Sequence, residues 1–113
     1  MRWIVSISPT QRTLAECRKR GYTVQVVEHW NAFARRRIDL FGVIDLVCIT
    51  PFGIMGIQAC AGSSHATRRT KIAAEPRAKL WTDAGARLEI WSWSKTGARG
   101  AVKKWTLRTE EVK

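Results

Sequence analysis

Two apolar runs separated by a four-residue turn constrain the fold of this chain more than any other feature. Residues 43–49 (VIDLVCI) and 54–60 (IMGIQAC) are nearly all apolar, and one polar residue interrupts each run. The intervening residues 50–53 (TPFG) are typical of a turn, because proline and glycine favour chain reversal. The pattern therefore predicts a β-hairpin. Since its strands are apolar on both faces, we expect helices to cover the sheet on each side.

The remaining segments carry helix and strand signals in a regular order. Ser8 can cap a helix that has Pro9 in its first position and ends before Gly21. Ser64 can cap a second helix in the same way. The other expected elements are an extended lead-in or short strand over 1–7, a strand over 22–28, a polar arginine-rich connection over 30–39, a helix over 64–74, a short helical segment over 76–84, and strands over 87–93 and 101–109.

This order predicts an α/β fold in which one mixed sheet is flanked by helices. A length of 113 residues without a repeat or linker indicates one domain, residues 1–113. The apolar content of 45% is too high for a disordered chain. No run approaches the roughly 20 apolar residues that span a bilayer, and the N-terminal residues do not form a secretory signal. We therefore expect a cytoplasmic protein with no membrane partner.

The three cysteines indicate a reducing environment. Cys17, Cys48 and Cys60 are odd in number and widely spaced, and they form no CxxC pair. We expect them to be reduced and mostly buried. A structural zinc site that combines them with His29 or His65 is an alternative, although the spacing is unlike that of common zinc sites.

The net charge is the first indication of function. Twenty Lys and Arg residues against nine Asp and Glu residues give a formal charge of +11. Such a charge favours a polyanionic partner, and nucleic acid is the usual one because binding releases counterions. A merely solubilising surface is the alternative. Three local clusters favour the partner: Arg35, Arg36 and Arg37; Arg68, Arg69 and Lys71; and Lys95, Arg99, Lys103 and Lys104.

The polar residues that interrupt the predicted hairpin are the candidates for chemistry. Asp45 and Gln58 lie in strands that should pair, so their side chains can lie next to each other. A buried lone carboxylate is costly unless it is paired or bound to a metal ion. Oxygen ligands at this spacing suit Mg²⁺. Glu16, on the first helix, would supply a further carboxylate.

Each candidate also has a purely structural interpretation. Glu16 can pair with Arg12 or Arg20 along its helix, and Asp45 can bond to the backbone or to an arginine. The other structural interpretations are Gln58 as a satisfied core amide, Asp39 as a surface partner of Arg36 or Arg37, and His29 and His65 as surface or capping residues. The six tryptophans are expected mostly in the core and over the sheet, although Trp30 can stack on exposed bases.

The order of these motifs resembles the PD-(D/E)XK nuclease core. That core has a helix bearing Glu, a strand, Asp in a hairpin followed by E/Q-x-K, and then a helix and a strand. More closely, the segments KRGYTV, RRRIDLFGVIDLVCI, GIMGIQAC, RRTKI and LEIWSW resemble small nuclease-like proteins of phages and prophages. Those proteins are related to Holliday junction resolvases and VRR-type nucleases. The resemblance covers roughly residues 13–93 and implies a restriction-endonuclease-like αβββαβ core.

The resemblance implies a metal-dependent endonuclease that cuts branched or otherwise structured DNA. It assigns Mg²⁺ or Mn²⁺ to Glu16, Asp45, Gln58 and the backbone carbonyl of Ala59. DNA binding would fall to the first two arginine clusters, namely Arg35, Arg36, Arg37, Arg68, Arg69 and Lys71. Resolvases of this type act as homodimers, because two symmetric cuts need two sites.

Two departures from the family pattern bear on activity. Gln58 stands where the second acidic ligand is usual, and Cys60 stands where E-x-K has its lysine. In some branches of the superfamily the lysine lies on the following helix, where this chain has Lys71 and, less suitably, Arg68. The alternative is a catalytically weakened or inactive nuclease-fold module that only binds nucleic acid.

Overall fold

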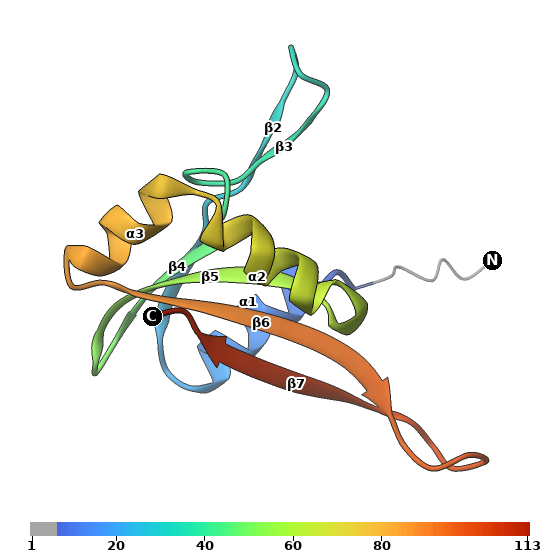
Figure 1. Cartoon of the computed structure of the whole chain (residues 1–113). Coiled ribbons are helices and arrows are strands. Elements are labelled where there is room, and N and C mark those ends of the chain that lie inside the picture. Colours follow the sequence, from blue (N-terminus) through green and yellow to red (C-terminus); the bar gives the residue numbers. More distant parts are fainter. Residues whose placement is uncertain (1–6) are drawn as a thin grey trace.

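The chain is built around a five-stranded mixed sheet with the strand order β1-β4-β5-β6-β7 (Figure 1). The structure is a computed structural model that describes residues 7–113. The strands of this sheet are β1 (Thr23–Val26), β4 (Leu46–Thr50), β5 (Gly53–Ala61), β6 (Arg87–Thr96) and β7 (Lys104–Glu111). β5 and β6 are parallel, and the other neighbours are antiparallel. The expected α/β class with one mixed sheet is confirmed.

The apolar hairpin is present as β4 and β5. Its register runs from Leu46 opposite Ile57 to Thr50 opposite Gly53. The Thr50 hydroxyl closes the turn, because it donates to the Gly53 carbonyl at 2.9 Å and accepts from the Phe52 N–H at 3.0 Å. β4 begins three residues later than expected. Asp45 nevertheless continues the ladder, since its N–H donates to the Ile57 carbonyl at 2.8 Å.

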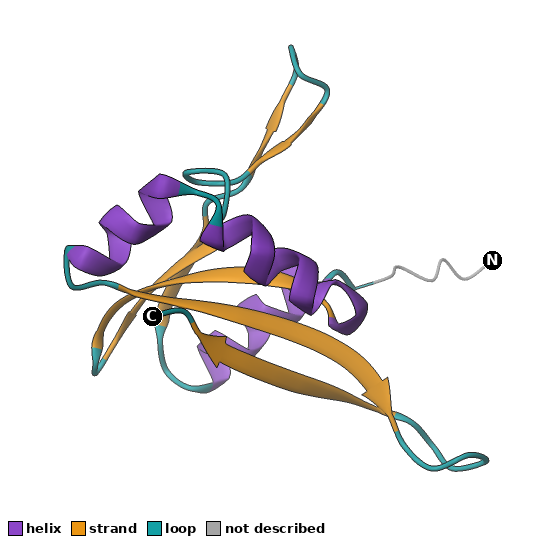
Figure 2. Cartoon of the chain, viewed as in Figure 1, coloured by secondary structure: helices purple, strands orange, loops and turns teal. Residues whose placement is uncertain are grey.

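Helices cover both faces of the sheet, as the apolar strands require (Figure 2). They are α1 (Pro9–Lys19), α2 (His65–Ala73) and α3 (Pro76–Asp83). One buried cluster joins Cys17 of α1 to sheet residues that include Leu46, Cys48, Ile57 and Trp91. A second cluster joins Ile72 of α2 and Ala78 of α3 to residues that include Ile44, Leu88 and Ile90. Each fully buried Ile or Leu side chain contributes roughly 1.5–3 kcal/mol to this packing.

The helix boundaries follow the sequence signals with one exception. At α1 the Ser8 hydroxyl accepts the Gln11 N–H at 3.2 Å, and Gly21 ends the helix with φ +81°. Ser64 makes no such cap, because its ψ of 1° is not the extended conformation of a capping residue. A 3₁₀ turn, η1 (Gly62–Ser64), leads into α2 instead. A Cβ at Gly62 would overlap the Ser94 hydroxyl, so a larger residue there would force the Ser94 side chain to move.

The arginine-rich connection is a β-ribbon rather than an irregular loop. β2 (His29–Asn31) and β3 (Arg36–Ile38) pair antiparallel and project from the body of the molecule (Figure 1). The Asn31 side chain stabilises the turn, because its carbonyl oxygen accepts the N–H groups of Phe33 and Ala34, each at 2.9 Å. The ribbon is mostly exposed on both faces, so its sequence lacks the alternation of apolar and polar residues that would have indicated two strands.

The last hairpin differs slightly from its expected bounds. β6 extends to Thr96 and β7 starts at Lys104, so the last hairpin is longer than expected and its turn lies further along. The expected lead-in strand falls on residues 1–7, of which 1–6 lie outside the described part.

The longest helix in residues 7–113 has 11 residues, about half of what a membrane span needs.

Candidate metal centre

Asp45 is the buried centre of the candidate site. It lies immediately before β4 and is only 3% exposed. Its Oδ2 atom accepts two hydrogen bonds from β5, from Gln58 Nε2 at 2.6 Å and from the Ala59 N–H at 2.9 Å. The hairpin therefore brings Asp45 and Gln58 together as expected, because the register places them opposite each other at the end of the ladder.

Two further carboxylates join Asp45, and both lie at the base of the ribbon. Glu28 directly precedes β2 and Asp39 directly follows β3. One oxygen from each of Glu28, Asp39 and Asp45 lies within 4.8 Å of the others. Pairing of β2 with β3 brings the two ends of the ribbon together, so both carboxylates reach the same place. The sequence pattern does not single out Glu28, and it predicts Asp39 as a surface partner of Arg36 or Arg37.

A cavity of about 480 Å³ opens beside these carboxylates. It is lined by the three acidic residues and by Gln58, Ala59 and Cys60 of β5, the N-terminal end of α1, and the cationic residues Arg37, Arg68 and Lys71. Acidic and basic side chains thus face one space in equal number. This combination suits a cation together with a bound phosphate group.

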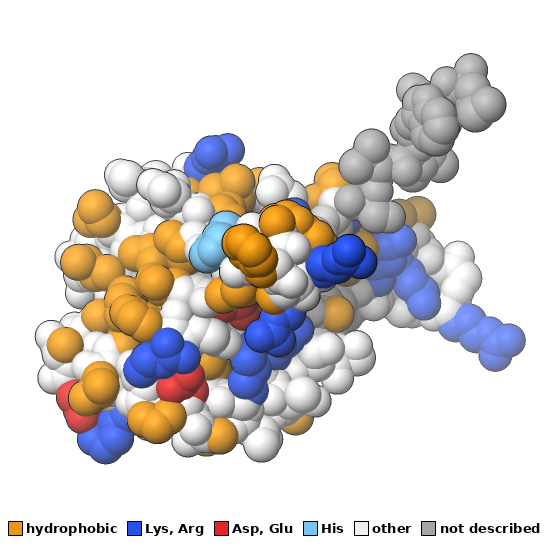
Figure 3. All heavy atoms as spheres, turned by 90° about the horizontal axis from the view of Figure 1, so that it is seen from above, with side chains coloured by type: hydrophobic (Ala, Val, Ile, Leu, Met, Phe, Trp, Pro, Cys, Tyr) orange, Lys and Arg blue, Asp and Glu red, His pale blue; other side chains and the backbone are white. Residues whose placement is uncertain are grey.

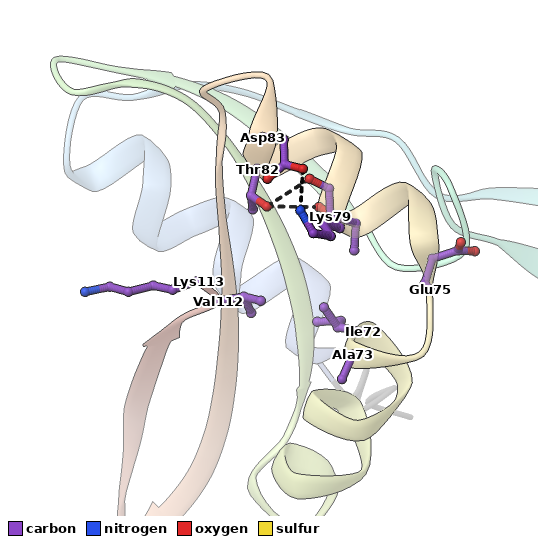
Figure 4. Close-up of a pocket in the computed structure, with 9 residues that line it drawn as sticks. Ile72, Ala73, Glu75, Lys79, Thr82, Asp83, Val112 and Lys113 are labelled. Carbon is purple, nitrogen blue, oxygen red and sulfur yellow. Dashed lines mark hydrogen bonds and ion pairs between the residues drawn. The ribbon is translucent and has the colours of Figure 1, made fainter.

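A second cavity lacks these features (Figure 4). It measures about 330 Å³ and lies between α2, α3 and the C-terminal residues, with Ile72, Ala78 and Val112 among its lining. Its Lys79 and Asp83 are paired with each other at 2.6 Å. Of these two cavities, only the one beside Asp45 combines a cluster of carboxylates with cationic side chains.

The environment of Asp45 opposes its ionisation. Burial, followed by the contact with Asp39 and the negative charge of that residue, raises the pKa of Asp45 to about 8. The hydrogen bond from the Ala59 N–H acts in the opposite direction but is weaker. Asp45 is therefore mostly protonated at neutral pH when no cation is bound. A divalent cation would replace this proton and remove the repulsion between the carboxylates.

Gln58 supplies an independent sign that a ligand belongs here. Its side chain is 1% exposed, and its Oε1 atom has no hydrogen-bond partner in the described part of the chain. Leaving a buried acceptor unsatisfied costs roughly 1–3 kcal/mol. A cation coordinated by this oxygen would remove the cost. Carboxylate and amide oxygens together are the ligands of hard cations.

Glu16 does not lie with these residues. It forms an ion pair with Arg20 at 2.9 Å along α1, which is the structural interpretation of this residue. α1 contributes Pro9 and Thr10 to the cavity, and Glu16 lies two turns further along the helix. The carboxylates beside Asp45 come from the base of the ribbon instead.

The two cations of α2 that line the cavity are placed as the sequence suggested. Lys71 reaches back from the helix, and its Nζ lies 3.4 Å from Asp39 Oδ2. Arg68 also lines the cavity, and its Nε is buried without a hydrogen-bond partner among residues 7–113. Cys60 occupies the wall beside them. Both Lys71 and Arg68 could therefore supply the positive charge that Cys60 lacks.

Arg69 has a different role from its neighbours. Its guanidinium donates two hydrogen bonds to Glu110 of β7, at 2.7 and 2.6 Å. Glu110 also contacts His65 Nε2 at 3.0 Å, and His65 Nδ1 lies 2.6 Å from Ser92 Oγ. Arg69 and His65 are therefore tied to the packing of α2 on the sheet rather than to the cavity.

The cysteines do not form part of a metal cluster in the described residues. All three are buried free thiols, as expected, and Cys17 Sγ lies 3.9 Å from Cys48 Sγ. The one group of three metal-binding side chains found in residues 7–113 contains only carboxylates. The zinc alternative therefore has no support in this part of the chain.

No protein-family model, no curated protein and no solved structure matches this chain.

Proposed function

We propose that this protein is a metal-dependent endonuclease that hydrolyses DNA phosphodiester bonds, with the PD-(D/E)XK type of active site that its sequence resembles. The observation that carries the proposal is the convergence of three carboxylates, an unpartnered amide oxygen and cationic side chains on one cavity. This set would hold Mg²⁺ or Mn²⁺ through Glu28, Asp39, Asp45 and Gln58. The resemblance adds the backbone carbonyl of Ala59.

Each part of the site has a definite task in this reaction. The metal ion would lower the pKa of a bound water and offset negative charge on the scissile phosphate. Lys71 and Arg68 would hold the phosphate and stabilise the additional charge that develops on it. Lys71 is the better candidate for this role, because it already lies against Asp39. Its position on α2 compensates for Cys60 in the E-x-K motif.

The partner of the site is DNA in this proposal. A charge of +11 on 113 residues favours binding to a polyanion through its phosphates, without readout of sequence. Branched or structured DNA as the substrate, and a homodimer as the active form, follow from the resemblance to junction resolvases.

Substitution of Asp45 tests the proposal. Asp45→Asn keeps an oxygen that can accept from Gln58 and Ala59, but it removes the charge that holds the metal ion. We expect cleavage to fall at least about 100-fold, while DNA affinity stays the same or rises slightly. The measurement is cleavage of linear, nicked, flap and four-way DNA with Mg²⁺, Mn²⁺ or EDTA, using tag-free protein.

Asp83→Asn is the matched control, because Asp83 is an exposed carboxylate on α3 that lies outside the cavity. Wild-type cleavage by Asp45→Asn would refute the metal-site assignment.

The second candidate function is nucleic-acid binding without catalysis. Gln58 in place of an acidic ligand and Cys60 in place of the lysine favour it. Under this alternative, DNA binding is identical with Mg²⁺ and with EDTA, and no substrate in the panel is cut. It also gives the same thermal stability with and without divalent cations.

A further inference from the structure

The β2–β3 ribbon is an arm that stands apart from the five-stranded sheet. Its strands pair with each other and not with the five-stranded sheet. It projects away from the body, and residues 32–37 are all exposed (Figure 1). The side chain of Asn31 holds its turn in shape, as described above. The arm is therefore an ordered structure that presents its side chains to the solvent.

The arm exposes two aromatic side chains. Phe33, in the turn, is fully exposed, and Trp30, on β2, is 61% exposed. Large aromatic rings usually bury much of their surface, and their exposure on a projecting element indicates a contact site. Trp30 lies opposite Arg37 in the ribbon register, so an aromatic ring and a guanidinium share one face of the arm.

The same arm carries three successive arginines. Within residues 7–113, Arg35 and Arg36 form no ion pair, and Arg37 makes one long contact of 3.8 Å with Glu28. Seen from above the ribbon, hydrophobic side chains and Lys or Arg side chains lie next to one another on this face (Figure 3). A partner that offers both negative charge and flat apolar surfaces matches this composition.

We propose that the β2–β3 ribbon binds unpaired bases of DNA, with Trp30 and Phe33 stacking on the bases and Arg35, Arg36 and Arg37 contacting the phosphates. Aromatic side chains interleaved with cations are the general means of binding single strands. A ribbon of this kind also fits the major groove of a duplex. In a duplex, however, stacked base pairs offer no free faces to the two rings, so unpaired bases are the better partner.

The base of the arm connects this binding site to the metal centre. Glu28 and Asp39 flank the ribbon and belong to the carboxylate cluster. Trp30 is two residues from Glu28, or about 7 Å along an extended strand. A base stacked on Trp30 would therefore lie within a few nucleotides of a phosphate in the cavity. The inference rests on the proposed function and narrows its substrate to DNA with unpaired bases next to the cut.

The test measures binding in EDTA, so that it does not depend on metal or cleavage. The probes are an end-labelled oligothymidylate and a blunt duplex of the same length, and the readout is fluorescence anisotropy. We expect Trp30→Ala and Phe33→Ala each to weaken oligothymidylate binding about fivefold or more. Their duplex affinity should change less than about twofold. Trp30→Phe keeps an aromatic ring and should retain most of the affinity.

Salt dependence separates the two parts of the arm. The aromatic variants should leave the slope of log K against log salt unchanged, whereas Arg35→Ala and Arg36→Ala should each reduce it by about 0.7 on single strands. Phe52→Ala is the matched control, because Phe52 is 79% exposed on the turn between β4 and β5. All these side chains are exposed, so the substitutions should leave the fold intact, and the thermal midpoint of each variant checks this.

Two results would overturn the inference. One is oligothymidylate affinity that is the same in Trp30→Ala, Phe33→Ala and Phe52→Ala. The other is loss of binding to anionic phospholipid vesicles, with no change on the oligonucleotide, since a membrane surface also accepts aromatic and basic side chains. Neither result affects the nuclease proposal, because that proposal is tested separately by the cleavage activity of Asp45→Asn.

Discussion

Asp45 is held in an environment that suits a metal ligand better than a structural residue. It accepts hydrogen bonds from Gln58 and Ala59, yet burial and the neighbouring Asp39 raise its pKa to about 8. In the unfolded chain its pKa returns to its ordinary value near 4. The folded state therefore favours the protonated form. The stability that comes from this preference is complete below about pH 4 and is lost as the pH rises to about 8.

This shift predicts how Asp45→Asn affects stability. In EDTA the variant should become more stable relative to wild type between pH 4 and pH 8, because it has no carboxylate to ionise. At pH 8 the difference in thermal midpoint should reach about 5 °C or more. Adding Mg²⁺ or Mn²⁺ at pH 8 should stabilise the wild type and not the variant. Parallel pH curves for the two proteins would show that the pKa of Asp45 is ordinary.

Under the nuclease proposal, Lys71 is the residue that would supply the cation missing from the E-x-K motif. Removal of one group that stabilises a developing charge typically costs a hundred- to a thousandfold in rate. We expect Lys71→Ala to lose roughly that much in single-turnover cleavage at saturating protein, and Cys60→Lys to restore part of it. Lys79→Ala, on α3, is the control. An unchanged single-turnover rate with weaker binding would show that Lys71 contacts phosphate without taking part in the chemical step. Arg68→Ala would then be the next variant to measure.

At the scale of elements, the sequence predicts those features that follow from the local pattern of apolar and polar residues. The β4–β5 hairpin was evident from its apolar runs, and it brought Asp45 and Gln58 together without further information. The ribbon was not evident, because its strands are short, polar and exposed. The positions of Glu28 and Asp39 depend on that ribbon, so they were missed as well. Glu16 lies outside the cavity, paired with Arg20, because the helical pattern of α1 does not indicate which of its turns faces the site.

A buried polar network joins α2 to the last two strands. His65 and Ser92 are each 2% exposed, and Glu110 connects His65 to Arg69. Serine, histidine and glutamate in this order resemble a hydrolase triad. His65 and Ser92 are buried away from solvent, and none of the three residues lines the cavity beside Asp45 or the cavity between α2 and α3. The network therefore stabilises the fold.

Glu110→Gln tests this structural role. Contacts with Arg69 and His65 lower the pKa of Glu110 to about 2. Its contribution to stability is therefore present above the ordinary pKa near 4.5 and is lost as the pH falls toward 2. We expect the variant to melt a few degrees below wild type at pH 7, and the difference to shrink as the pH falls from 4.5. Asp83→Asn should show no comparable loss, and an equal loss there would mean that the network adds nothing specific.

At the scale of the whole molecule, two of the three basic clusters lie on separate projections. The ribbon carries one basic cluster, and the tip of the β6–β7 hairpin carries another; the two extend in different directions (Figure 1). The four cations at or near this tip are Lys95, Arg99, Lys103 and Lys104, and none forms an ion pair within residues 7–113. Their role is predicted to be contact with DNA phosphates at a distance from the candidate metal centre.

Neutralising this tip distinguishes a local contact from a general effect of charge. Changing all four cations to Gln lowers the formal charge from +11 to +7. If each contacts one phosphate of duplex DNA, the slope of log K against log salt falls by about 0.9 per residue. Affinity should fall equally for all sequences, with the single-turnover rate at saturating protein unchanged. The control changes four cations from other parts of the surface, Arg18, Lys19, Lys79 and Lys113, to Gln. The same reduction in slope for both variants would mean that net charge, and not the hairpin tip, drives binding.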